Sequence, residues 1–501
     1  MKTFQNIFVK TVSYFFILLF IYASVSKLLD FENFQVQIAQ SPLLSAYAGF
    51  ISYAVIISEL IISLALILYG YRLVGLYASL FLMTSFTLYI YLILNYSEYI
   101  PCSCGGVLEK LDWESHLIFN ILCILIAVIS IFLMSSIKIK PVRTLVLLFS
   151  TVLSSSSVVL ILFFSSEHLI KKNNQFIRRF SHHPIQIDKS LDLKVNSYYF
   201  AGESNGKIIL GNYTNPMVLT VVDSSFSQYR QKILKLDQYN HQFKFLKLYA
   251  RDSYFFLADG SVPVMYRGLI TEGIAKTISY NKIYFDQLAI LDSTNVAFRT
   301  YNPKTQNRST GIVNLLTGLY HLNPDIIKKQ KDGLFDTDGL LTSDNESKQF
   351  YYIYFYRNTI TSVDLNEKIS QQNTIDTTTI AKVKSTVMSN GKMKMTAPPV
   401  MVNKMATVAE GLLFNESNLM GNYENRDQWG KNSIIDIYNT KDKSYRGSFY
   451  VQHKGKNKMI QMFATRNYFY ILIGNEIIRY RYAQAISENF SKGDAENLKS
   501  E

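Results

Sequence analysis

Five apolar runs in the first third of the chain constrain its fold more than any other feature. Each is about 20 residues long, the length that spans the hydrocarbon core of a bilayer as a helix. They lie at residues 8–26, 47–69, 74–94, 117–134 and 144–165. Backbone polar groups in lipid must be bonded within their own segment, so the sequence predicts five transmembrane helices. Two lysines, Lys2 and Lys10, lie at the start of the first run, as in a signal peptide, but the later spans favour a helix that stays in the chain.

Basic residues in the short loops predict which side of the membrane each loop occupies. They lie at the start of the first run, between the second and third, and between the fourth and fifth: Lys2, Lys10, Arg72, Lys138, Lys140 and Arg143. Positively charged loops stay in the cytoplasm, so everything after the fifth run is predicted to lie outside. Arg178 and Arg179 oppose this orientation, although long domains cross largely regardless of charge. We therefore predict a multi-pass protein of the bacterial inner membrane with a periplasmic C-terminal domain.

From residue 191 the chain changes to short runs rich in Tyr, Phe, Ile and Val, which Gly, Asn, Asp and Ser separate. Tyr198–Gly202, Met217–Val222 and Phe350–Phe355 are examples, and such runs indicate an all-β domain. About six loosely similar units recur, each near 50 residues, a spacing typical of propeller blades. A six-bladed β-propeller is the leading prediction, and a pair of β-sandwiches is the alternative.

The predicted fold class is therefore a membrane α-helical bundle, of four helices plus a fifth anchoring helix, followed by an all-β domain. The predicted parts are a four-helix membrane domain at 1–136, a fifth helix at 137–168, a linker at 169–190, the β domain at 191–485 and a polar, disordered tail at 486–501. Residues 389–404, with two methionines and two adjacent prolines, are expected to form a long loop between blades.

Two of the three cysteines, Cys102 and Cys104, are one residue apart in the loop before the fourth run. A disulfide in so tight a ring is strained, and strained, exposed disulfides are the labile or catalytic kind. One thiolate could attack a partner disulfide while the other resolves the mixed disulfide. The alternatives are an inert disulfide or half of a metal site, but a structural zinc would need four ligands, so no metal is predicted.

His116 follows Trp113 at the start of the fourth run, close in sequence to the two thiols. A neighbouring histidine can lower a cysteine pKa or shuttle its proton. Alternatively, the histidine and tryptophan only anchor a helix end at the membrane surface. Cys123 lies within the fourth run and is expected to be inert, because a thiol in apolar surroundings behaves as a small hydrophobe.

Glu59 lies inside the second run, where an ionisable group is costly and by default marks a functional or pairing site. Lys27, Ser58 and Ser85 are its candidate partners. A proton relay or a carboxyl beside a quinone is one reading, and a hydrogen bond that stabilises the bundle is the other. Lys27 itself, at the outer end of the first run, either joins a charged pair with Asp30 or snorkels to the interface.

Composition argues against other classes of function. The net charge is +13, but the basic residues are scattered rather than gathered with exposed aromatics, so nucleic acid is not an expected partner. The β region has no cysteine and shows no hydrolase triad pattern, phosphate loop or paired histidine ligands. It is expected to be a binding surface.

Several segments of the first third resemble the MauE family of methylamine-utilisation membrane proteins, which groups with the DoxX-like four-helix proteins. The segments are Tyr22–Asp30, Ser41–Leu44, Glu59 and Pro101–Gly106, and the resemblance covers about residues 5–135. It implies a redox-associated bundle that acts with a thioredoxin-like protein in maturing disulfides of exported proteins, a methylamine dehydrogenase subunit in the name-giving system. A fifth helix and a β domain depart from the short family members, and no residue points to methylamine. The β region is similar, in texture only, to divergent six-bladed propellers of Bacteroidota-type envelope proteins.

The sequence thus predicts a membrane thiol–disulfide redox protein in which Cys102 and Cys104 exchange electrons with a thioredoxin-like periplasmic partner. Lys27, Glu59 and His116 would assist, an exported protein would be the client, and a quinone is a candidate cofactor. Whether the chain is itself an enzyme is left open. The rival is a non-enzymatic, membrane-anchored β-propeller that binds or senses a ligand. A transporter is disfavoured because matched, broken helices are not evident.

Overall fold

The chain divides into two compact units. The computed structural model describes residues 2–40, 44, 47–96, 113–135, 140–170, 176–181, 184–302, 307–344, 346–389, 391–397 and 399–490. The membrane unit comprises Met1–Lys172 together with Val383–Pro399. The β unit comprises Asn173–Lys382 and Val400–Glu501. A short segment from within the β region thus belongs to the membrane unit.

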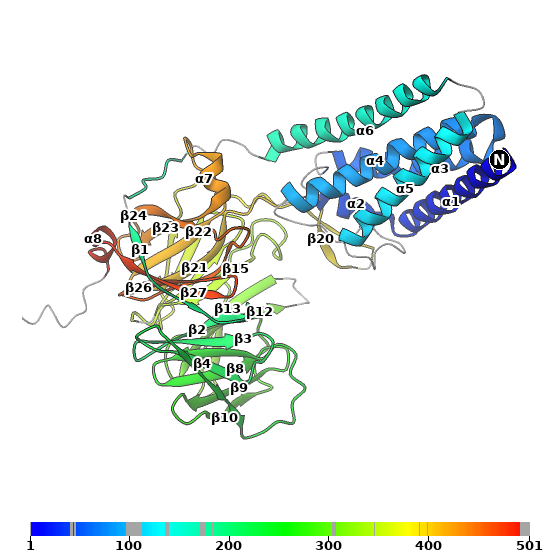
Figure 1. Ribbon diagram of the computed structural model, residues 1–501. Coiled ribbons are helices and arrows are strands. Elements are labelled where there is room, and N and C mark those ends of the chain that lie inside the picture. Colours follow the sequence, from blue (N-terminus) through cyan, green and yellow to red (C-terminus); the bar gives the residue numbers. More distant parts are fainter. Residues whose placement is uncertain are drawn as a thin grey trace, which may run out of the picture. The chain divides into compact units, whose positions relative to one another are not determined.

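Among the described residues, five long helices make up most of the membrane unit (Figure 1). They are α1 (Lys2–Leu29), α3 (Ala48–Ile67), α4 (Arg72–Tyr96), α5 (Trp113–Ser135) and α6 (Pro141–Ile170). The short helices α2 (Phe31–Gln40) and η2 (Tyr69–Tyr71) complete the unit. Each long helix contains a stretch long and apolar enough to cross a membrane, which confirms the five predicted spans. The chain is a membrane protein.

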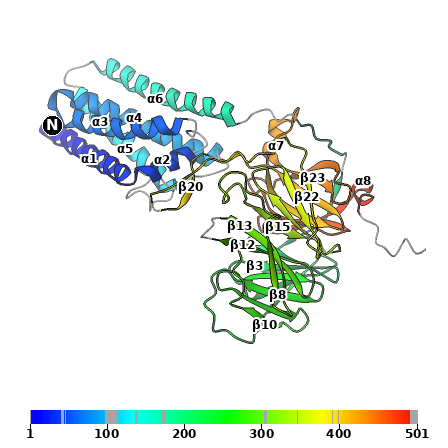
Figure 2. The ribbon, with the colours of Figure 1, turned by 180° about the vertical axis from the view of Figure 1, so that it is seen from behind.

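The long helices lie side by side in both views (Figures 1 and 2). α1 packs against α3 and α5, and α4 packs against α3, α5 and α6. Fully buried apolar side chains from four helices fill the space between them, among them Phe16, Leu66, Leu80 and Ala127. α6 begins at a proline, which suits the first position of a helix because its missing N–H would have no helical partner there.

Serines in α6 explain how an apolar run can carry so many hydroxyls. Ser157 Oγ donates to Leu153 O at 2.8 Å, the back-bond that satisfies a hydroxyl inside a helix. Ser155 instead reaches α4, where it donates to Phe81 O and shares a hydrogen bond with Ser85 Oγ, both at 2.8 Å. In lipid such a bond between helices fastens α6 to the bundle.

Helix α2 is an element that sequence reasoning missed. Phe34 and Ile38 are four residues apart, so they share one face, and both are buried against Ala48 and Ile56 of α3. A hairpin from the segment Val383–Pro399, β19 (Ser385–Val387) with β20 (Met393–Met395), contacts α2. Ser389 donates to Glu32 Oε2 through its backbone N at 3.2 Å and its Oγ at 3.0 Å. The expected loop at 389–404 therefore contains β20, and the last two residues of that loop begin the strand Asn403–Ala409.

The β unit consists of antiparallel runs of four strands, and the first two runs are joined edge to edge by a parallel pair in one nine-stranded sheet. The first two runs are β2 (Tyr198–Ser204), β3 (Lys207–Asn212), β4 (Val218–Val222), β5 (Tyr229–Ile233), and β7 (Lys247–Arg251), β8 (Tyr254–Asp259), β9 (Val264–Leu269), β10 (Ile274–Tyr280), which carries β6 (Lys235–Leu236) at its edge. The third and fourth are β11 (Gln287–Ile290), β12 (Asn295–Asn302), β13 (Asn307–Asn314), β14 (Tyr320–Asn323), and β15 (Gly339–Ser343), β16 (Phe350–Tyr354), β17 (Thr359–Val363), β18 (Ile369–Asn373).

The remaining two runs complete the described part of the β unit, and two short helices accompany them. These are β21 (Asn403–Ala409), β22 (Leu412–Ser417), β23 (Asn432–Asn439), β24 (Tyr445–Gln452), and β25 (Met459–Ala464), β26 (Tyr468–Ile473), β27 (Glu476–Tyr482), with helices α7 (Arg426–Lys431) and α8 (Gln484–Ser487). The last run gains its fourth strand from the start of the unit, because β1 (Ile185–Asp192) pairs antiparallel with β27. This strand begins within the segment that the sequence assigned to the linker, and only its last two residues lie in the predicted β domain.

The runs close into a ring. The first strand of each run contacts the first strand of the next, and β25 of the last run returns to β2 of the first. One cluster of buried apolar side chains lies between each pair of neighbours around the ring. A ring of four-stranded antiparallel sheets is a β-propeller, so the predicted propeller-like domain is confirmed in place of a sandwich pair.

Packing on both faces explains why the β runs in the sequence are continuously apolar. All five residues of β16 are buried. Phe350, Tyr352 and Tyr354 face the cluster shared with the third run, and Tyr351 and Ile353 face the cluster shared with the fifth. Because successive side chains of a strand point to opposite faces, a sheet between two neighbours needs apolar residues at every position.

The linker is tied to the fifth run by Arg178, which is buried. Its Nε donates to Asp436 Oδ1 at 2.7 Å, its Nη1 to Glu424 Oε1 at 2.6 Å and its Nη2 to Ser417 Oγ at 2.7 Å. Burial lowers the pKa of Arg178, but the two carboxylates raise it above its usual value. This arginine, which the loop-charge pattern counted against an outer β domain, forms part of the folded core.

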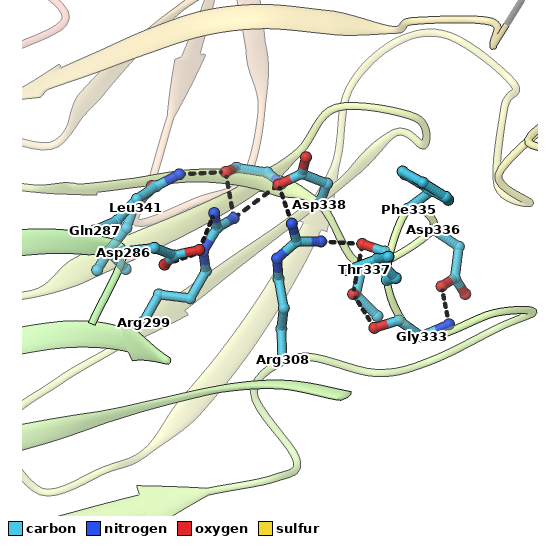
Figure 3. Close-up of polar contacts among 12 residues, drawn as sticks. Asp286, Gln287, Arg299, Arg308, Gly333, Phe335, Asp336, Thr337, Asp338 and Leu341 are labelled. Atoms are coloured by element: carbon cyan, nitrogen blue, oxygen red, sulfur yellow. Dashed lines mark hydrogen bonds and ion pairs between the residues drawn. The ribbon is translucent and has the colours of Figure 1, made fainter. Parts of the chain in front are cut away.

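A second buried arginine joins the third and fourth runs (Figure 3). Arg299 on β12 holds both carboxylate oxygens of Asp286, at 2.8 and 2.7 Å. Its Nη1 reaches Asp338 Oδ1 at 2.9 Å and Tyr352 Oη at 3.0 Å in the neighbouring run. Arg308 approaches the same Asp338 oxygen at 3.5 Å. Two arginines and two aspartates balance each other's charge, and the cluster ties the third run to the fourth.

Candidate functional site

A cavity of about 240 Å³ lies inside the membrane unit. All six helices from α1 to α6 contribute to its lining, which is mostly aliphatic and aromatic. Lys27, Glu59 and His116 are among the lining residues. Three of the five predicted site residues, from three different helices, are therefore brought together here. Cys102 and Cys104, the other two, lie outside the described residues.

Lys27 and Glu59 form a buried ion pair. Lys27 lies in the last turn of α1, where the helix dipole favours a cation. Its Nζ is 2.5 Å from Glu59 Oε1 on α3, and Ser24 Oγ donates to Glu59 Oε2 at 2.9 Å. The Lys27 and Glu59 side chains are 9% and 1% exposed. Both carboxylate oxygens thus have a donor, which is the condition under which a buried ion pair is tolerated.

Of the partners that the sequence offered to Glu59, the structure selects Lys27. Ser58 Oγ turns back to Val55 O at 2.8 Å, and Ser85 bonds to Ser155 of α6. Ser24 was not foreseen, although it lies three residues before Lys27 and so on the same face of α1. The lysine also lies 5.6 Å from the ring centre of Phe34, so helix α2 supplies a cation–π contact to the pair.

Trp113 and His116 lie in the first turn of α5, and both line the cavity. Their rings are 6.3 Å apart between centres and nearly parallel, at 26°. In sequence Trp113 follows Cys104 by nine residues. The two aromatic rings therefore form part of the cavity wall.

Asn120 is a cavity residue that sequence reasoning missed. It lies four residues after His116, on the same face of α5, and only 2% of it is exposed. Its Nδ2 has no acceptor among the described residues. Leaving a buried donor without a partner costs about 1–3 kcal/mol. An amide held at that cost beside a cavity is a candidate for contacting a ligand. Cys123, on the same helix, is buried in the apolar cluster between the helices.

The β unit holds a second, polar cavity of about 560 Å³ between the fourth and fifth runs. Carboxylates and lysines line it: Asp344, Glu346, Asp364, Lys368, Glu410 and Lys441. Burial raises the pKa of Glu410, although Arg466 lies 3.1 Å from its Oε2. In the part of the chain that the structure describes, no three His, Cys, Asp or Glu side chains are grouped as metal ligands.

Comparison with known proteins supports the resemblance seen in the membrane region. Residues 5–133, which are 129 of the 501 residues, match the family described as Methylamine utilisation protein MauE. No curated protein matches the chain.

Several solved structures resemble the β region at low identity. They include a member of the DUF4221 family from Bacteroides vulgatus (13% identity, 62% of this chain and 99% of that one, TM-score 0.39). A putative exported protein from Bacteroides fragilis (10%, 62% and 99%, TM-score 0.40) and virginiamycin B lyase from Staphylococcus aureus (10%, 60% and 100%, TM-score 0.36) are similar to about the same extent. At such scores the propeller assignment rests on strand order alone.

Proposed function

We propose that this membrane protein, whose residues 5–133 match the MauE family, is a thiol–disulfide redox protein. Cys102 and Cys104 pass electrons to or from a thioredoxin-like partner during the maturation of exported proteins. One observation carries the proposal. Three ionisable residues that the sequence nominated for this chemistry, Lys27, Glu59 and His116, line one cavity inside the family-matched bundle.

The proposed exchange needs only two thiols and a base. One thiolate attacks a sulfur of the partner's disulfide, and the partner's other sulfur leaves as a thiolate. The second thiol of the pair then attacks the mixed disulfide, which releases the reduced partner and leaves Cys102 and Cys104 bonded to each other. Two electrons move from this protein to its partner, and the reverse sequence moves them back. His116 is the nearest candidate in sequence to accept the thiol proton.

The inner membrane is the proposed location, with the β unit in the periplasm. Loop charges support this orientation, and an oxidising outer compartment suits a disulfide-exchanging pair. Arg178, which argued for the opposite side, is neutralised by two carboxylates in the folded β unit. The β unit would then recruit the client or the thioredoxin-like partner.

Trapping tests this function directly. Cys102→Ser and Cys104→Ser are each expressed in cells, and mixed disulfides are captured by acid quenching and alkylation. We expect one of the two variants to accumulate a covalent complex with a thioredoxin-like protein. Cys123→Ala, which removes the buried third cysteine, is the matched control and should trap nothing. A pair that stays in one redox state, with no complex in either variant, would refute the proposal.

The polar cavity of the β unit favours one alternative, a membrane-anchored binding or sensor protein. In that case the bundle is only an anchor, and Cys102 and Cys104 are dispensable. Replacing both cysteines by serine would leave the cellular phenotype of the protein unchanged, whereas charge reversal at Glu410 or Asp344 in the polar cavity would abolish it. The redox proposal expects the double cysteine variant to behave as a deletion.

A further inference from the structure

The membrane cavity has the properties of a site for a small lipid-soluble molecule. Six helices of a membrane-spanning unit line it, and most of its lining is apolar. An apolar cavity of about 150 Å³ can hold one benzene molecule, and this cavity measures about 240 Å³. That is room for one substituted six-membered ring. A ligand that reaches such a site dissolves in the bilayer rather than in water.

The polar groups of the cavity call for a ligand that accepts a hydrogen bond. Asn120 Nδ2 is buried, lines the cavity and has no acceptor among the described residues. The Lys27 ammonium and the Glu59 carboxyl line the same space. A plain acyl chain would fill the apolar part but would leave the Asn120 donor unsatisfied. A carbonyl oxygen would satisfy it.

The walls favour a flat ring. Trp113 and His116 present nearly parallel rings to the cavity, and Phe34 and Phe119 line it from two further positions. Aromatic side chains pack well against a planar conjugated ring in offset or edge-to-face arrangements. Planarity, carbonyl acceptors and solubility in lipid together describe a quinone.

We infer that this cavity binds the ring of a quinone, with Asn120 donating to one of its carbonyl oxygens. In its redox role, which rests on the proposed function, the quinone is the electron acceptor of the cysteine pair. Two thiols and one quinone give one disulfide and one quinol, so two electrons and two protons pass from sulfur to the quinone oxygens. The Lys27–Glu59 pair lies where it can relay a proton to an oxygen that is being reduced.

Fluorescence of Trp113 tests the binding without any activity assay. The chain has two tryptophans, Trp113 and Trp429. Trp429→Phe leaves Trp113 alone as a reporter in the cavity wall. The full-length protein in lipid nanodiscs is titrated with decylubiquinone, and in parallel with decylbenzene, which has the same tail and a ring without carbonyls. We expect saturable quenching by the quinone and no competition from a several-fold excess of decylbenzene.

Two asparagines of the bundle provide a matched pair of variants. Asn120→Leu removes the cavity donor and should weaken quinone binding about three- to tenfold, the value of one neutral hydrogen bond. Asn95→Leu makes the same change at an exposed position of α4, where Nδ2 donates to Tyr91 O, and should leave binding unchanged. Equal binding of the two ligands, or equal loss in the two variants, would overturn the inference. The ligand comparison needs no variant, so it decides even where Asn120→Leu does not fold.

The same titration in protein with Cys102 and Cys104 both changed to serine separates this inference from the proposed function. If the double variant binds the quinone saturably and neither single cysteine variant traps a partner, the quinone site stands and the thiol exchange is refuted. If a single cysteine variant traps a partner but the quinone does not bind saturably, the thiol exchange stands and the quinone site is refuted.

Discussion

Removing Lys27 from its buried pair should destabilise the membrane unit by about 3–4 kcal/mol. At 2.5 Å and an effective dielectric constant of about 20, the pair gains about 7 kcal/mol of attraction, which offsets the cost of removing both charges from water. Without Lys27, Glu59 keeps only the Ser24 donor. Glu59 can avoid being an unpaired buried charge by taking up a proton. Protonation at pH 7 costs about 4 kcal/mol for a carboxyl with an ordinary pKa of about 4.3. That value limits the loss.

A double-mutant cycle measures the coupling itself. Lys27→Met should cost about 3–4 kcal/mol, and Glu59→Leu less, since Lys27 near a helix end can extend toward the membrane surface. The double variant should return to within about 1 kcal/mol of the parent, because apolar residues of similar volume replace a buried pair at little cost. The expected coupling energy is therefore at least about 2 kcal/mol.

Denaturation in mixed detergent micelles, followed by Trp113 fluorescence in the Trp429→Phe background, gives these free energies for the membrane unit. Lys10→Met is the control. It makes the same substitution at an exposed position of the same helix and should change stability by less than about 0.5 kcal/mol. If the effects of Lys27→Met and Glu59→Leu simply add to within about 0.5 kcal/mol in the double variant, the two residues are not coupled and the reasoning fails.

Three further predictions concern the β unit and the inserted hairpin. Arg178→Met should lower the stability of the β unit by about 3–5 kcal/mol in thermal unfolding, because its carboxylate partners stay buried, whereas Arg179→Met at the exposed neighbour should cost less than about 1 kcal/mol. Burial raises the pKa of Asp259, but hydrogen bonds from three backbone N–H groups and a serine hydroxyl lower it below its usual value. The stability that Asp259 provides is therefore present above about pH 4 and lost as the pH falls further, so an acid titration of Asp259→Asn should lack this part of the loss. Glu32→Ala should speed tryptic cleavage after Lys394 in β20, since Glu32 accepts both hydrogen bonds of Ser389; an unchanged cleavage rate would contradict a role for this contact.

The five spans were predictable because lipid leaves the backbone almost no choice. A run of 20 apolar residues in a bilayer must be helical, whatever its neighbours do. Helix α2 was missed for the opposite reason. It is 10 residues long, and its polar residues obscure the two apolar positions, Phe34 and Ile38, that hold it against α3. Its helical structure depends on a surface that another helix provides, and a sequence window of that length contains no such information.

The propeller was predictable from its repeat, but its closure was not. Repeated sequence units of about 50 residues predict propeller blades, since each sheet buries both of its faces against similar neighbouring sheets. Pairing of β1 with β27 joins Ile185 to Tyr482, and Arg178 meets Asp436 across 258 positions of sequence. Neither partnership leaves a local pattern, because any strand with the right alternation, or any buried carboxylate, would satisfy the same chemistry.

The cavity was partly predictable from the sequence, more so than the closure of the propeller and less so than the five spans. Helical spacing alone placed Ser24 on the Lys27 face of α1 and Asn120 on the His116 face of α5, so each half of the polar lining could have been read from one helix. The sequence did not predict that these faces of α1, α3 and α5 meet. Apolar helices pack in lipid without a strong sequence pattern that fixes which of their sides touch. The buried ionisable residues supply the packing information that the apolar residues lack. A carboxylate inside a bilayer requires a cation nearby, and Lys27 is the cation that Glu59 reaches. Buried charge therefore constrains how these helices are rotated, and the cavity forms where that constraint holds them.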